Sequence, residues 1–345
     1  MSPVAPLLIV GVALGPQGLG LLPAGALAAI DPAIPVALAV LGTLLGLGLP
    51  RAMGDRGEWA RSVVGGAVPA VLVAAALFAL ARPFPDTGAA VWALALVGGI
   101  AAASSLTWPI AAGEDTGSRV RTYLTVETVW PVVAGGLALA WLHQPFLTGA
   151  LWLVVQGGAI ALVLALAAWL LVQGASSPVE QRIFAVAAVL LVGGAADQLA
   201  SSALLAGLVA GLLWHRLGGE AREGLERDVR YARHPLVALV LVVAGARAEV
   251  TAPGVALAAV YLALRTAARL GGWRTARRGG TRLEPGTATR VVAPGVFGVA
   301  FALNAYRAVG ADLSVPLSAI VFGSVAGDVL ARLLARRRDG EGVEG

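Results

Sequence analysis

The sequence predicts an all-α polytopic membrane protein with about twelve transmembrane helices. Its 345 residues are 58% hydrophobic and only 13% charged, whereas soluble domains carry about 25% charged residues. The mean hydropathy is +0.82. Twelve spans of roughly 22 residues leave room for short connections only, so we expect no soluble catalytic domain.

Apolar runs divided by charged gaps place the expected helices in order along the chain. The expected spans are 4–22, 32–50, 62–81, 89–113, 122–142, 148–173, 183–199, 201–215, 235–248, 252–272, 291–309 and 312–333.

The distribution of arginine sets the expected orientation. All 25 basic residues are arginine; twenty lie in the gaps on one side of the twelve spans, three lie on the other, and Arg265 and Arg269 lie within span 10. Arginine-rich short gaps mark the cytoplasmic side. We therefore expect a multi-pass plasma (inner) membrane protein with cytoplasmic N- and C-termini, a single transmembrane domain over 1–338 and a short cytoplasmic tail over 339–345.

Two successive helices recur seven spans apart, which predicts an inverted repeat. Spans 1 and 8 each contain a GxxxG motif, and the helix that follows each of them opens with a proline, Pro35 or Pro235. An odd offset gives the two copies opposite orientations. The expected repeats cover about 4–142 (spans 1–5) and 201–333 (spans 8–12).

Spans 4 and 11 hold matching places in the two repeats, and both contain helix-breaking residues. Span 4 includes Ser104 and Pro109, and span 11 includes Pro294 and Gly295. Such residues are tolerated at membrane depth where the backbone is buried in protein or lines a cavity. Paired broken helices also mark transporter sites. We expect both helices to be interrupted and to cross near the midplane, although a simple proline kink in either helix is the alternative.

Composition argues against several function classes. With no cysteine and three scattered histidines, a thiolate metal site, a redox centre or a zinc enzyme is not expected, and neither is a cofactor. The arginines lie in short gaps as topology signals do, so no nucleic-acid partner is expected. The sequence therefore indicates a protein that is not an enzyme and acts within the lipid bilayer.

Four stretches, in order, resemble the cation:proton antiporter superfamily, which has the sodium/proton exchanger fold. Residues 14–20 are similar to that family's early GPxxLG turn, and 196–211 to its AExLGLSxxLGAFLAG helix. Residues 242–247 and 291–295 resemble its later F-V-x-x-G run and the start of its second broken helix. The resemblance covers nearly the whole chain. It implies alternating access of a core bundle across a dimerisation bundle, and a homodimer.

The resemblance departs at the family's ion site, where the pattern runs T-D-P and later G-E-S-x-x-N-D. This chain has Trp108 at the aspartate of T-D-P and Pro131-Val132 at N-D, and keeps the glutamate of G-E-S as Glu127. A rival alignment, to a branch with Q-D in this helix, makes Glu127 the ion-binding carboxylate itself. Depth favours the first alignment, because Glu127 lies about 7 Å inside the membrane whereas the midplane falls near Val132.

Glu127 and Arg265 are the leading candidate site residues. Both are charged, lie within spans and have comparable expected depths, so we expect them to form an ion pair. That pair is structural in one interpretation, and in the other Glu127 binds a cation or a proton. The other candidate ion or substrate ligands are Ser104, Ser105, Thr107, Asn304 and Asp197, with local backbone bonding, an interhelical amide contact or simple exposure as the ordinary alternatives.

Three functions follow in order of preference. The first is a secondary active transporter that exchanges a monovalent cation, Na⁺ or K⁺, for protons. The second is a transporter of another small solute or organic anion on the same fold, which the missing midplane carboxylate favours. The third is a non-transporting helper or sensor with an antiporter fold.

Overall fold

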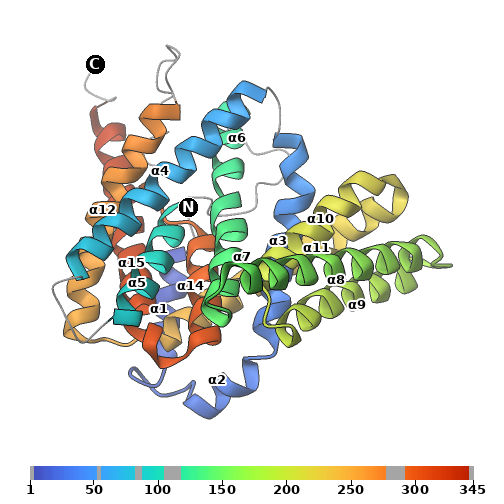
Figure 1. Ribbon diagram of the computed structural model, residues 1–345, viewed down its shortest axis with the longest axis horizontal. Coiled ribbons are helices and arrows are strands. Elements are labelled where there is room, and N and C mark those ends of the chain that lie inside the picture. Colours follow the sequence, from blue (N-terminus) through green and yellow to red (C-terminus); the bar gives the residue numbers. More distant parts are fainter. Residues whose placement is uncertain (1–3, 53–55, 82–87, 105–117, 277–291, 342–345) are drawn as a thin grey trace. The chain divides into compact units, whose positions relative to one another are not determined.

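The computed structural model describes residues 4–52, 56–81, 88–104, 118–276 and 292–341, which contain helices and no strand. The α-helices are α1 (Val4–Leu14), α2 (Ala24–Ile30), α3 (Ala33–Ala52), α4 (Arg56–Ala81), α5 (Gly88–Ala102), α6 (Ser118–Glu127), α7 (Val129–His143), α8 (Leu147–Gln173), α9 (Pro178–Gln198), α10 (Ala203–Leu217), α11 (Gly219–Arg247), α12 (Ala252–Ala276), α14 (Val296–Val309) and α15 (Ser314–Glu341). A short 3₁₀ turn, η2 (Ala311–Leu313), precedes α15 (Figure 1).

Each of the twelve predicted spans contains a helix. Among the described residues, eight helices are long and apolar enough to cross a membrane, and four shorter apolar helices accompany them. The predicted all-α, multi-pass class is thereby confirmed. The number of spans and their orientation stay predictions.

Helix α11 begins at Gly219, before the predicted span over 235–248. Two other predicted spans are shortened or divided in the structure, and proline explains both differences. The helix expected over 4–22 ends at Leu14, because Pro16 cannot continue it, and the chain turns before α2. The helix expected over 122–142 is broken at Thr128 into α6 and α7. Pro131 has no N–H to donate to the carbonyl of Glu127, and its ring crowds that carbonyl.

The chain divides into two compact units. Unit 1 comprises residues 1–23, 54–131 and 241–345, and unit 2 comprises 24–53 and 132–240, so two of the four divisions fall within helices, namely α7 and α11. The single domain expected over 1–338 stays a prediction. Helix α15 continues to Glu341, three residues into the predicted tail.

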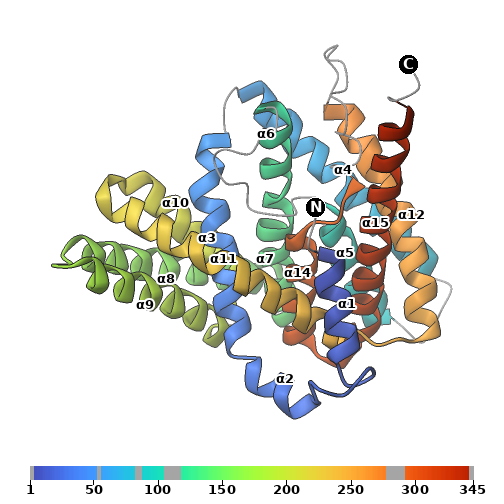
Figure 2. The ribbon, with the colours of Figure 1, turned by 180° about the vertical axis from the view of Figure 1, so that it is seen from behind.

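In unit 1, long helices pack on one another and on the shorter helices α1, α5 and α14. Helix α12 packs on α4 and α15, and α14 packs on α5 and α15. Helix α1 lies beside α15, as both Figure 1 and Figure 2 show. In unit 2, α10 packs on α3, α8 and α9, and α8 and α9 lie side by side.

Glycines bring two helix pairs to backbone contact in a reciprocal pattern. In unit 1, a Cβ on Gly11 of α1 would lie 2.2 Å from the carbonyl oxygen of Val242 on α11. In unit 2, a Cβ on Gly207 of α10 would lie 2.1 Å from the carbonyl oxygen of Ala39 on α3. The first helix of each expected repeat thus packs on the second helix of the other. Exchanged pairing of this kind suits an inverted repeat, which stays a prediction.

The orientation can be checked with introduced thiols, because the sequence contains no cysteine. Gln144 and Glu223 are both exposed and lie in gaps expected on opposite sides of the membrane. In intact cells, an impermeant maleimide should label Gln144→Cys, and should label Glu223→Cys only after permeabilisation. Labelling of Glu223→Cys from outside would overturn the orientation.

Candidate functional site

The candidate site lies in unit 1, where the end of α5 meets the start of α14. Gly295 caps the N-terminus of α14 in an extended conformation. A Cβ on Gly295 would lie 2.8 Å from the carbonyl oxygen of Ser104, and a Cβ on Gly298 would lie 2.3 Å from that of Ala101. Glycine is therefore required for the two backbones to approach this closely. Spans 4 and 11 therefore contact each other here. The interruption of span 4 and the crossing of the two helices near the midplane stay predictions, because the second half of span 4 lies outside the described residues.

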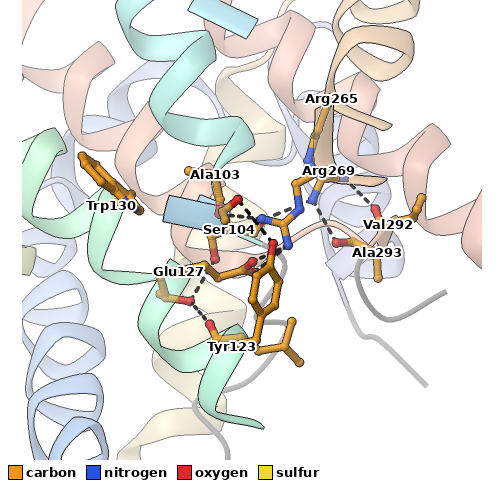
Figure 3. Close-up of polar contacts among 12 residues, drawn as sticks. Ala103, Ser104, Tyr123, Glu127, Trp130, Arg265, Arg269, Val292 and Ala293 are labelled. Atoms are coloured by element: carbon orange, nitrogen blue, oxygen red, sulfur yellow. Dashed lines mark hydrogen bonds and ion pairs between the residues drawn. The ribbon is translucent and has the colours of Figure 1, made fainter. Parts of the chain in front are cut away.

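Helix α12 presents two arginines to this meeting point from one face, since positions four apart lie above one another. Arg265 is 2% exposed. Its Nη1 donates to the carbonyl of Val292 at 2.6 Å, and its Nη2 donates to the carbonyls of Ala293 at 2.9 Å and Ser104 at 3.1 Å. Figure 3 shows this guanidinium beside Val292 and Ala293. Arg265 therefore links the end of α5 to the segment before α14.

Arg269 forms the buried ion pair of the site. Its Nη2 donates to both carboxylate oxygens of Glu127, at 2.7 and 2.6 Å, and its Nη1 donates to the carbonyl of Ala103 at 2.7 Å (Figure 3). Both charged side chains are fully buried. Charge-assisted bonds of this geometry are strong, and they offset part of the cost of burying the two charges.

The predicted Glu127–Arg265 pair is therefore wrong in its basic partner. Glu127 is buried and paired as expected, but with Arg269, while the hydrogen bonds of Arg265 go to carbonyls. The two arginines are one helical turn apart, a rise of about 6 Å. An estimate of depth from the sequence cannot separate residues that lie so close together on one face.

The helix break at Thr128 adds a hydroxyl contact between α5 and α6. The Thr128 hydroxyl donates to the carbonyl of Leu124 at 2.7 Å. Its oxygen lies 3.2 Å from Oγ of Ser104, so we assign Ser104 as the donor, since a hydroxyl carries one proton. Ser104 thus contacts both Arg265 and Thr128, while its role as a ligand stays a prediction.

Helix α4 accepts hydrogen bonds from two aromatic side chains near the ion pair. Pro69 cannot donate to the carbonyl of Gly65, and that carbonyl accepts the Tyr123 hydroxyl at 3.4 Å. The Tyr123 ring lies 5.9 Å from the guanidinium carbon of Arg269, within range of a cation–π contact. Trp130 Nε1 donates to the carbonyl of Val63 at 2.8 Å.

The remaining predicted ligands are not gathered here. Asn304 is buried on α14, its Nδ2 lacks a hydrogen-bond partner, and no hydrogen bond joins it to the arginines. Asp197 belongs to unit 2 and is exposed at the end of α9. Ser105 and Thr107 lie outside the described residues, as does Trp108.

Sequence reasoning missed the roles of Arg269, Thr128 and the carbonyls of Val292 and Ala293. A signal existed for Arg269, which lies within the same span as Arg265 and four residues later. Backbone carbonyls carry no side-chain signal, so their positions follow only from the fold. No group of histidines, cysteines and carboxylates that could hold a metal ion occurs among the described residues.

The end of α5 and the segment before α14 thus meet at buried charged side chains, in a chain with several helices long and apolar enough to cross a membrane. No known family profile and no curated protein sequence matches the chain. Among solved structures, it is similar to the sodium proton antiporter MjNhaP1 of Methanocaldococcus jannaschii, with a TM-score of 0.67, 14% identity, and coverage of 96% of this chain and 91% of that one. The chain therefore has the cation:proton antiporter fold, which confirms the resemblance noted in the sequence.

Proposed function

We propose that the protein is a secondary antiporter that exchanges a monovalent cation, Na⁺ or K⁺, for protons by alternating access. The observation that carries this proposal is the buried Glu127–Arg269 pair, which lies where the end of α5 meets the start of α14, within an antiporter fold. Ions in transporters of this kind bind where unwound backbone is buried near the bilayer midplane.

Glu127 is the carboxylate through which a proton would act. Among the described residues of unit 1, the buried carboxylates are Glu127 and Asp328. Asp328 accepts from Arg332 four residues later on the same helix, at 2.6 and 3.0 Å, so this pair forms within one helix. Protonation of Glu127 removes the charge that holds Arg269, and Arg269 also holds the end of α5 through Ala103. Proton binding would thereby loosen the interrupted helix.

Cation-dependent proton movement in proteoliposomes tests the proposal. With a pH-sensitive dye inside and a proton gradient imposed, we expect addition of sodium, lithium or potassium to collapse the gradient. With one charge exchanged for one, an imposed membrane potential should leave the rate unchanged. Protein-free liposomes serve as the control. Silence towards all three cations, from protein shown to be folded, would contradict the proposal.

A second candidate, transport of an organic anion, is favoured by the charges of the site. The described cluster has two guanidinium groups, Arg265 and Arg269, and one carboxylate, Glu127. The family's aspartate positions hold Trp108 and Pro131-Val132. Proton movement driven by small carboxylates, with none driven by alkali cations, would support this candidate. If neither small carboxylates nor alkali cations drive proton movement, the remaining candidate function is that of a non-transporting helper protein.

We further propose that the protein is a homodimer in the plasma (inner) membrane. Unit 2 exposes large apolar side chains along α8 and α9, including Trp152, Val163, Ile183 and Val186. Such a surface suits lipid or a second copy of the chain.

A further inference from the structure

We infer that the backbone carbonyls of Ser104, Val292 and Ala293 form a monovalent-cation site, which the guanidinium of Arg265 occupies in this structure as a tethered cation. The inference deepens the proposed function, on which its meaning for transport rests. It names where the transported cation binds and what it displaces.

The three carbonyl oxygens converge on one guanidinium. Val292 O lies 2.6 Å from Nη1, while Ala293 O and Ser104 O lie 2.9 and 3.1 Å from Nη2. The oxygens come from two segments far apart in the sequence, one after α5 and one before α14. Rings of carbonyl oxygens from separate segments are how channels and transporters replace the water around an alkali cation.

These carbonyls lie at the ends of helices. Ser104 follows the end of α5 at Ala102, and Val292 and Ala293 precede α14, which begins at Val296. A buried carbonyl at membrane depth needs a donor or a cation. The C-terminal end of α5 also carries the negative end of its helix dipole, which favours a positive charge beside it.

Arg265 makes no hydrogen bond to a carboxylate in this structure, and its partners are carbonyls alone. Its neighbour one turn later, Arg269, instead has Glu127. Arg265 is therefore held by the same groups that would hold a free cation. Such a site needs no midplane carboxylate, in keeping with Trp108 and Pro131-Val132 at the family's acidic positions.

Removal of the Arg265 side chain should leave a site that a small cation can fill. We expect purified Arg265→Ala to melt at a lower temperature than wild type in detergent. Millimolar guanidinium chloride should raise its Tm by roughly 2 °C at ten times the dissociation constant. Wild type, whose site is occupied, should not respond. Sodium, potassium and choline chloride at equal ionic strength show whether alkali cations also bind and whether salt acts alone.

Leu262→Ala is the matched control, because Leu262 lies one turn before Arg265 on α12 and faces Gly327, which Arg265 also approaches. It removes side-chain volume and leaves the carbonyls filled, so its Tm should not respond to guanidinium. If Arg265→Ala cannot be purified in folded form, Arg265→Gln, which is neutral, takes its place with the same outcomes.

Equal responses of the Arg265 variant and Leu262→Ala to guanidinium, or no response from either, would overturn the inference. The assay measures binding and not flux. A guanidinium response without cation-driven proton movement would reject the proposed antiport and keep the site. Antiport by wild type without any response of the variant to guanidinium would reject the proposed site and keep the proposed antiport.

Discussion

Replacement of Arg269 by methionine should lower the stability of the protein by about 3–5 kcal/mol, because it leaves Glu127 charged and buried without its partner. Both side chains are fully buried, and their atoms approach to 2.6 Å. Glu127→Leu should cost a similar amount. The double variant, with two apolar groups, should recover much of the loss. Thermal unfolding in detergent of the four proteins measures the coupling.

Two controls accompany this double-mutant cycle. Arg182→Met removes an arginine whose side chain is 64% exposed and 3.8 Å from Asp228, so its effect should stay below about 1 kcal/mol. The cycle of Glu127 with Arg265 should give a smaller coupling energy than the cycle with Arg269. Simple addition of the Glu127 and Arg269 losses would show that the two residues are uncoupled.

Gly298→Ala should have the second large effect, since it adds a methyl group where α14 touches α5. The new Cβ would lie 2.3 Å from the carbonyl oxygen of Ala101, so one backbone must shift. Overpacking of this kind costs about 1–3 kcal/mol or more. We expect a lower Tm together with slower transport, because the shift moves Ser104 and its contacts.

Gly158→Ala is the matched control, since nothing lies within 4 Å of a Cβ at that position on α8. Alanine favours a helix over glycine by up to about 1 kcal/mol, so this variant should be as stable as wild type or more so. An unchanged Tm in Gly298→Ala would mean that α5 and α14 do not meet at this glycine.

The helices and the break before α14 were predictable because each leaves a local signal. Apolar runs divided by charged gaps located a helix in all twelve segments, and Pro294 with Gly295 located the break before α14. Pro131 was noted only as a departure from the family pattern. Its effect on the carbonyl of Glu127, four residues earlier, breaks the helix at Thr128.

The partners within the site were not predictable from the sequence. Arg265 and Arg269 share one face of α12, and the choice between them depends on how α6 and α12 are shifted along each other. That shift is set by close packing at Gly66 and Gly272, where Cβ atoms would meet Glu127 and the carbonyl of Gly65. Contacts of this type leave no pattern in one sequence.

Access to Ser104 from the two sides of the membrane tests alternating access at this site most directly. Ser104 is fully buried in this structure, and the sequence has no cysteine, so Ser104→Cys provides a single thiol that keeps the carbonyl contact. In oriented vesicles, we predict that a small impermeant thiol reagent modifies it from either side, with the faster side reversing when the cation and proton gradients are reversed. Gln144→Cys should react from the outer side alone. Reaction of Ser104→Cys from one side under every gradient, or from neither side while Gln144→Cys reacts, would contradict the proposed mechanism.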